Sequence, residues 1–229
     1  MTVLWHPNLP EGFKEFCAKV SIDTSSIQYE NDSLMRRVRG CDDYGIACCV
    51  SYQAIGKAIQ FFGARANLAK ALLLAINEGR CENTGTLMVE GIKPLSSDVL
   101  DFDEVMENYK KVLHEVARVY NETMNIIHYM HDKYDYEKSQ MAFIDTDPKI
   151  NLAYGVAGLS IVADSLSAIK HAKVTARRNA DGLTEGFDIE GSFPMFGNDD
   201  DRVDVLARDI VQLFDTELRA RKVYKGAEP

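Results

Sequence analysis

The chain has 229 residues, of which 46% are hydrophobic and 27% are charged, the balance of an ordinary globular protein. Its net charge of −9 and pI near 5.1 exclude the basic footprint that non-specific nucleic-acid binding requires. No apolar run reaches the roughly 18 residues of a membrane span, and residues 1–10 carry no signal-peptide pattern.

The first forty residues predict one short helix between irregular segments. Residues 1–10 contain Pro7 and Pro10 and predict an irregular lead-in, and the polar residues 21–32 predict a loop. The helix is expected over residues 11–19, with Phe13, Phe16 and Val20 buried at helical spacing. Arginines then gather within residues 35–44, a pattern typical of a solvated face: Arg36, Arg37 and Arg39.

Two adjacent cysteines, Cys48 and Cys49, follow in a small apolar segment, residues 45–51. Consecutive Cα atoms lie about 3.8 Å apart, closer than the roughly 4.4–6.8 Å of an unstrained disulfide. Both should therefore be thiols, and in an extended segment they would point to opposite sides. Such a pair could relay a group from one side to the other. On the dipeptide alone, two small buried hydrophobes are the favoured interpretation.

The cysteines as a set show no spacing typical of a disulfide framework or a zinc site. The total of five is odd and shows neither disulfide nor Cys-x-x-Cys zinc spacing. We therefore expect reduced thiols and a cytoplasmic location. The remaining three are Cys17, Cys41 and Cys81.

A second chemical candidate is the segment Phe61-Phe62-Gly63-Ala64-Arg65, which follows a turn or short helix expected at residues 54–58. The planar guanidinium of Arg65 can grip a carboxylate through two parallel hydrogen bonds. The ring of Phe62 could exclude water beside it. The competing interpretation is a surface arginine near the start of the next helix.

The middle of the chain predicts two helices. Residues 67–77 are rich in Ala and Leu, and Gly79 is placed to end that helix. After a loop or irregular hairpin over residues 80–97, Asp101 and Glu104 predict the start of an amphipathic helix that runs to about residue 131. Its expected inward residues are Tyr109, Val112, Leu113, Val116, Val119, Tyr120, Met124 and Ile127.

His128 and His131 on this helix are i, i+3 neighbours that could share a metal ion. No acidic third ligand stands at a recognised spacing, so we expect no metal site. Likewise, residues 155–158, Gly-Val-Ala-Gly, lack the full dinucleotide-binding fingerprint.

The last third alternates helices and strands. Helices are expected at residues 136–143, 160–172 and 202–223, the last capped from residues 198–201. Residues 151–161 suit a buried strand or its turn into a helix, and strands at 173–178 and 186–192 flank the turn signal Asp181-Gly182. The last helix should direct inward Val205, Leu206, Ile210, Leu213, Phe214 and Leu218.

Several stretches resemble the pyruvate formate-lyase (formate C-acetyltransferase) family of glycyl radical enzymes. They are residues 18–26, 28–32, 42–44, 47–51, 60–70, 125–134 and 163–170, and the resemblance runs through residues 1–229 with little interruption. It implies an α/β, helix-rich chain that forms part of the family's ten-stranded α/β barrel, with the cysteine segment, about residues 41–51, reaching into its centre. The family's Arg-Val-Ser-Gly-Tyr segment, which carries the radical glycine, is not in these residues. We therefore expect an internal portion of the domain, without the C-terminal glycine radical domain.

The resemblance also implies the chemistry. A radical-SAM activating enzyme places a radical on the glycine, Cys49 passes it to Cys48, and the Cys48 thiyl attacks pyruvate. Formate leaves, and coenzyme A, the co-substrate, collects the acetyl group. Phe62 and Arg65 match residues that line the pyruvate site, and Cys48 should converge with them on one cavity. No prosthetic group is implied, and the full-length family is expected to be homodimeric.

Alternatives remain at this stage. Alone, the chain should be catalytically silent, and it could be a non-catalytic remnant or an interaction protein. A 2-ketobutyrate formate-lyase is a further alternative, whereas dehydratases of the superfamily typically carry one active cysteine with a nearby glutamate. The chain departs from the family pattern at Phe143-Ile144, where a Leu-His pair is common, and at Tyr154, where a small residue or cysteine is usual.

Overall fold

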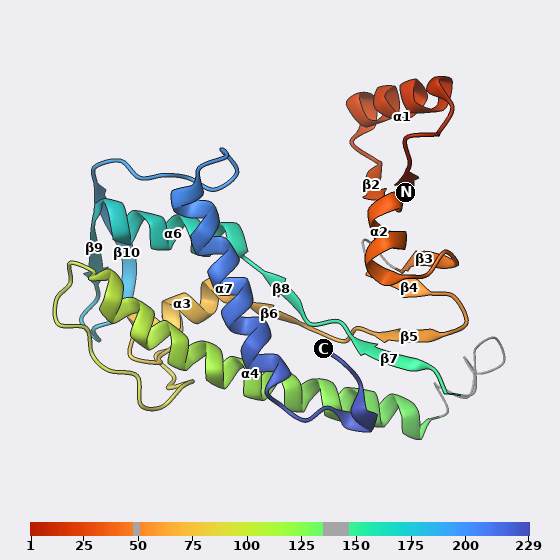
Figure 1. The fold of residues 1–229 in the computed structure, drawn as a ribbon. Helices are drawn as coiled ribbons and strands as arrows, with labels where there is room; N and C mark the ends of the chain where they lie inside the picture. Colours follow the sequence, from red (N-terminus) through yellow and green to blue (C-terminus); the bar gives the residue numbers. More distant parts are fainter. Residues whose placement is uncertain (48–50, 135–146) are drawn as a thin grey trace. The chain divides into compact units, whose positions relative to one another are not determined.

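A computed structural model describes residues 1–47, 51–134 and 147–229, which divide into two compact units. Unit 1 comprises Met1–Phe61 and Asp135–Asn151, and unit 2 comprises Phe62–Tyr134 and Leu152–Pro229 (Figure 1). The predicted helix at residues 136–143 and the departure at Phe143-Ile144 lie outside the described residues, as do Cys48 and Cys49.

In its described residues, unit 1 is built from short paired strands and two helices. These helices are α1 (Glu11–Thr24) and α2 (Asp32–Arg39). Strand β1 (Thr2–Trp5) pairs in parallel with β2 (Gln28–Asn31), and β3 (Tyr44–Ala47) pairs antiparallel with β4 (Ser51–Ala54). Strand β5 (Ala58–Phe61) pairs with β7 (Lys149–Leu152). The expected turn between β4 and β5 is confirmed at residues 55–57.

The start of unit 1 corrects three predictions. Residues 1–10 are not an irregular lead-in, because β1 forms there, and the predicted loop at residues 21–32 is partly helix α1 and partly strand β2. Helix α1 does not bury Phe13 or Phe16, which are 41% and 61% exposed. Only Cys17 of that helix is buried. The strand was missed because its partner lies 26 residues away, a pairing that local patterns do not encode.

Unit 2 is organised around four helices: α3 (Leu68–Ile76), α4 (Phe102–Lys133), α6 (Leu159–His171) and α7 (Asp201–Arg219). A 3₁₀ turn, η2 (Tyr224–Gly226), follows them. Polar side chains begin three of these helices, since Asn67, Asp101 and Asp200 each accept a hydrogen bond from a backbone N–H of the first turn. The predicted start of α4 at Asp101 is thereby confirmed.

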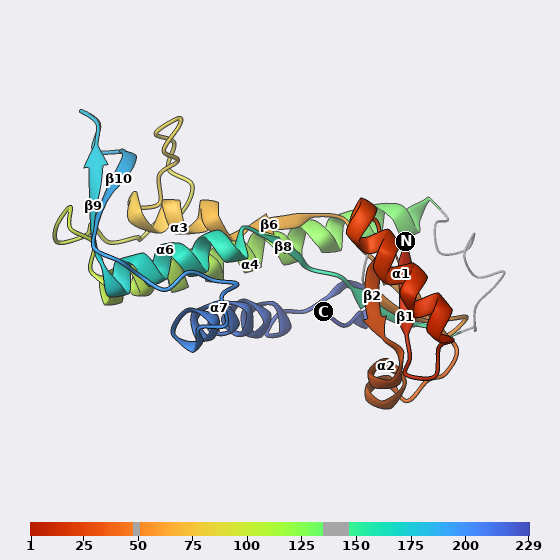
Figure 2. The ribbon, with the colours of Figure 1, turned by 90° about the horizontal axis from the view of Figure 1, so that it is seen from above.

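The core of unit 2 lies where α3 and α7 pack on α4, with α6 against α7 (Figure 2). The stripe predicted on α4 is confirmed for five residues: Tyr109, Val112, Leu113, Tyr120 and Met124. Val119 is 47% exposed and does not belong to it. On α7, Val205 is also exposed, because the buried positions there follow the i, i+3, i+7 spacing from Val203 and leave Val205 on the opposite side.

Two strand pairs complete unit 2. The predicted hairpin is confirmed as β9 (Lys173–Arg178) paired antiparallel with β10 (Thr184–Glu190). Strand β6 (Arg65–Asn67) pairs in parallel with β8 (Gly155–Ala157), and each leads into a helix, α3 or α6 (Figure 1). Arg65 therefore lies on a strand, and Asn67 caps the helix that was predicted to include it. The α/β, helix-rich prediction is confirmed.

Among the described residues, no helix is both long and apolar enough to cross a bilayer.

Candidate functional site

The two cysteines of interest directly follow a paired strand. Strands β3 and β4 are in register from Tyr44↔Ala54 to Ala47↔Ser51, and residues 48–50 join them. Cys48 and Cys49 lie outside the described residues, so their separation and orientation stay predictions.

The base of this strand pair is held by aromatic and charged side chains of unit 1. The Tyr44 hydroxyl donates to Asp32 Oδ1 at 2.7 Å, and the rings of Tyr44 and Tyr52 stack with centroids 5.0 Å apart. The guanidinium carbon of Arg39 lies 5.4 Å from the Tyr52 ring centroid. Burial and the hydrogen bond to Asp32 raise the pKa of Tyr44 to about 12, so this phenol stays protonated at neutral pH. Two arginines of the predicted solvated face thus take part in these contacts, because Arg36 also pairs with Asp32.

Phe62 and Arg65, the second candidate pair, lie together in unit 2. The guanidinium carbon of Arg65 is 4.9 Å from the centroid of the Phe62 ring, a cation–π arrangement. Phe62 is 43% exposed, and Arg65 is also exposed. Arg65 is thus exposed beside the ring, and an exposed guanidinium can donate two parallel hydrogen bonds to a carboxylate.

Gly155 makes this stack possible. It is the register partner of Arg65 across the β6–β8 pair. A Cβ atom added at Gly155 would lie 2.9 Å from Phe62 Cε2, closer than real Cβ atoms come to other atoms, and 3.0 Å from Arg65 Cγ, tighter than most such contacts. The two side chains therefore rest directly on the backbone of residue 155.

Tyr120 of α4 holds the other side of the same strands. Its hydroxyl donates to the carbonyl oxygen of Ala64, and the carbonyl oxygen of Gly155 lies 3.1 Å from it. The side chain is buried, and burial raises its pKa to about 12. A neutral phenol thus contacts the backbone immediately before Arg65 and the backbone beneath Phe62.

A further layer surrounds Tyr120. The rings of Tyr120 and Tyr154 meet edge to face with centroids 5.0 Å apart. The Tyr154 hydroxyl donates to Asn121 Oδ1 at 2.6 Å, and Asn121 Nδ2 donates to the Lys222 carbonyl at 2.9 Å. Tyr154, one of the departures from the family pattern, therefore fills space against Tyr120 and ties this layer to the C-terminal segment.

Arg65 also lines a groove of about 320 Å³ in unit 2. Tyr120 and Glu115 line the same groove, and Glu115 pairs with Arg118. That carboxylate already has an arginine partner, and Arg65 is the cation on the lining of this groove that could attract an anionic ligand. The groove is large enough for a small 2-oxo acid.

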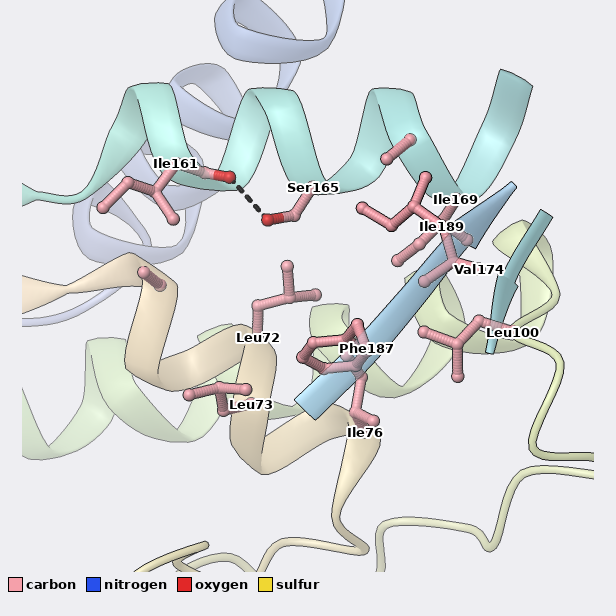
Figure 3. A pocket seen from close by; sticks show the side chains of 12 residues that line it. Leu72, Leu73, Ile76, Leu100, Ile161, Ser165, Ile169, Val174, Phe187 and Ile189 are labelled. Atoms are coloured by element: carbon pink, nitrogen blue, oxygen red, sulfur yellow. Dashed lines mark hydrogen bonds between the residues drawn. The ribbon is translucent and has the colours of Figure 1, made fainter. Parts of the chain in front are cut away.

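A second cavity, of about 220 Å³, lies between α3, α6 and the β9–β10 hairpin (Figure 3). Figure 3 shows aliphatic side chains and the Phe187 ring around it. Its only side-chain hydroxyl, Ser165, donates to the Ile161 carbonyl at 2.7 Å. With no charged side chain on its lining, this cavity offers nothing to hold a carboxylate, and we do not assign it to the site.

One further thiol has an unusual environment. The Thr84 side chain, the backbone N–H of Asn83 and the Lys70 ammonium, 3.2 Å away, lower the pKa of Cys81 to about 7. Lys70 is in turn paired with Glu82. No cluster of three or more metal-ligating side chains occurs in the part of the chain that the structure describes.

Several solved structures share this fold. They include the B12-independent glycerol dehydratase from Clostridium butyricum (TM-score 0.73, 21% identity) and a glycyl radical enzyme from Archaeoglobus fulgidus (0.70, 17%). A third is the Roseburia inulinivorans protein of 1,2-propanediol dehydration (0.74, 19%). Each match covers 99% of this chain and 33% of the other. At these identities the likeness establishes the fold alone.

The sequence then defines the family. The family model for pyruvate formate lyase-like proteins matches residues 1–229, and the chain belongs to this family. Formate acetyltransferase 1 from Escherichia coli (strain K12) is 54% identical over all 229 residues. The chain spans 30% of that relative's length.

Sequence reasoning missed two residues of this site. Tyr120 was predicted only as an inward residue of α4, and Gly155 only as a glycine within an apolar segment. The available signals were a tyrosine hydroxyl on the inward stripe of α4 and a glycine at the start of a short strand. Neither signal says which distant residues are contacted.

Proposed function

We propose that residues 1–229 supply the two-cysteine site and the pyruvate-binding residues of a formate acetyltransferase, as an internal portion of its domain. The reaction is the cleavage of pyruvate with coenzyme A to acetyl-CoA and formate. The observation that carries the proposal is 54% identity over the whole chain to formate acetyltransferase 1. The stacked Phe62–Arg65 pair beside an open groove supports it.

Each cysteine has one role in this proposal. The glycyl radical of the family, carried by a residue outside 1–229, supplies the unpaired electron. Cys49 gives up its thiol hydrogen atom first and then takes one from Cys48. The Cys48 thiyl sulfur adds to the carbonyl carbon of pyruvate, and the C1–C2 bond breaks. The carboxyl carbon departs as the CO2 radical anion, which takes the hydrogen atom of the Cys49 thiol to become formate and leaves the unpaired electron on Cys49. The acetyl group remains on Cys48 until the thiol of coenzyme A takes it.

Arg65 and Phe62 orient the substrate. The guanidinium donates two hydrogen bonds to the pyruvate carboxylate and thereby fixes the orientation of the substrate. Phe62 covers one side of this ion pair and keeps water from a radical site. A radical-SAM activating enzyme, a homodimeric full-length protein and a cytoplasmic location belong to the same proposal.

A chimera tests the proposal. Residues 1–229 replace the matching segment of Escherichia coli formate acetyltransferase 1, and the activating enzyme is supplied without oxygen. We expect a glycyl radical signal by electron paramagnetic resonance and formate release that depends on pyruvate and coenzyme A. A chimera that carries the radical but releases no formate would instead identify a non-catalytic remnant.

Matched variants assign the residues. Replacing Arg65 with Gln should lower kcat/KM for pyruvate by roughly 10²-fold or more, since a charged bidentate partner is lost. Arg37→Gln removes an exposed arginine of α2 and should leave the activity within about twofold. Equal losses in both variants would contradict the assignment of Arg65.

A further inference from the structure

A short strand pair carries the Phe62–Arg65 stack. Strand β6 has three residues, and its partner β8 has three as well. A parallel pair this short has few hydrogen bonds to hold it. Contacts from outside the two strands therefore add to what holds Arg65 in place.

Tyr120 makes such a contact at the start of both strands. Its hydroxyl touches the carbonyl oxygens of Ala64, which precedes β6, and of Gly155, which begins β8. One side chain of the long helix α4 thus reaches the start of both strands. The helix is anchored by fully buried neighbours, including Ala117 and Met124, so the hydroxyl is a fixed reference point.

On the opposite side, the stack packs against Gly155, which has no side chain. Phe62 and Arg65 pack close to the Cα of Gly155: a Cβ there would lie 2.9 Å from Phe62 Cε2 and 3.0 Å from Arg65 Cγ. The carbonyl oxygen of the same residue faces the Tyr120 hydroxyl. A displacement of Tyr120 would therefore move residue 155, and with it both side chains of the stack.

We propose that Tyr120 and Gly155 are positioning residues for the carboxylate-binding pair: the hydroxyl holds the two strand starts, and the glycine leaves the space in which Phe62 stacks on Arg65. The proposal rests on the proposed function, because it concerns how pyruvate is held. It predicts that a change at either residue weakens pyruvate binding and spares coenzyme A.

The test uses the activated chimera with Tyr120→Phe, which removes the hydroxyl and keeps the ring. KM for pyruvate should rise roughly tenfold, because a displaced guanidinium loses its hydrogen-bond geometry. KM for coenzyme A and the radical yield should stay within about twofold. Tyr154→Phe is the matched control: it removes a neighbouring hydroxyl that contacts Asn121 rather than the strand starts, and both KM values should stay within about twofold.

A second variant approaches the stack from its other side. Gly155→Ala forces Phe62 and Arg65 away and should raise KM for pyruvate roughly tenfold or more, again with KM for coenzyme A unchanged. Gly12→Ala, where an added Cβ meets nothing within 4 Å, is its control. If Tyr120→Phe prevents radical formation, the KM of Gly155→Ala for pyruvate tests the proposal.

The outcomes separate the two proposals. A radical-bearing but inactive parent chimera overturns the proposed function. An active parent in which Tyr120→Phe and Gly155→Ala leave KM for pyruvate unchanged, or raise both KM values alike, overturns the positioning role.

Discussion

The two units of the chain are built differently. Unit 2 encloses a core that includes fully buried side chains of α4, such as Tyr109, Leu113 and Met124. The described residues of unit 1 bury fewer apolar side chains and leave both phenylalanines of α1 exposed. The residues proposed for chemistry are divided between the units: the cysteines belong to unit 1, and Phe62 and Arg65 belong to unit 2. The unit with the buried helical core thus carries the pair proposed to bind substrate, and the other unit carries the cysteines proposed to react.

The largest expected effect is the difference in stability between a core variant of unit 2 and a surface variant of unit 1. Leu113→Ala removes a fully buried side chain of unit 2 and should lower the free energy of unfolding by about 2–5 kcal/mol. Phe16→Ala removes an exposed ring of unit 1 and should change it by no more than about 0.5 kcal/mol.

Urea denaturation can follow the units separately. Trp5, the only tryptophan, lies in unit 1, and the long helices lie in unit 2. Leu113→Ala should shift the circular dichroism transition more than the tryptophan fluorescence transition. A common shift in both signals would show one cooperative unit and break the comparison.

A smaller effect probes close packing within unit 2. Gly79 has φ +79°, and a Cβ there would lie 1.9 Å from the Val89 carbonyl oxygen. Gly91 has φ +74° but meets nothing within 4 Å. Both alanine variants should incur the roughly 1–2 kcal/mol of a left-handed residue, and Gly79→Ala should lose a further ~1–3 kcal/mol from the clash. Equal midpoints in urea would contradict this packing.

The smallest effect concerns a thiol of unit 2 that is not assigned to the site. Cys81 should react with iodoacetamide with a midpoint near pH 7, because its neighbours favour the thiolate. Thr84→Val removes the strongest of these hydrogen bonds and should move the midpoint to higher pH. Loss of the labelling in Cys81→Ser would assign it to Cys81. An unchanged midpoint in Thr84→Val would refute the role of Thr84 in lowering the pKa of this thiol.

How much of the fold could be predicted depends on how local the signal for each element is. The helices α3, α4 and α7 were predictable because Ala/Leu content, caps and apolar spacing are local signals. Strand β1 was not, since its partner β2 is distant in sequence, and β6 was not, since it pairs with a strand 90 residues further on. The expected burial of Phe16 failed because helical spacing says which residues share a face, and not whether anything covers that face.

The candidate site shows this limit as well. Phe62 and Arg65 came from the family resemblance, and the structure brings these two together. Their dependence on Tyr120 and Gly155 could not be predicted, because a carbonyl contact and an absent Cβ leave no pattern in one sequence. The convergence of Cys48 on this pair stays a prediction.

The central claim is that Cys48 carries the acetyl group. The direct measurement supplies the activated chimera with pyruvate but no coenzyme A, quenches it with acid, and locates the acetyl group by tandem mass spectrometry. We expect acetyl on Cys48 and none on Cys49 or Cys81, with no acetyl in Cys48→Ser. Acetyl found on another residue, or formate released while Cys48 stays unmodified, would contradict the account.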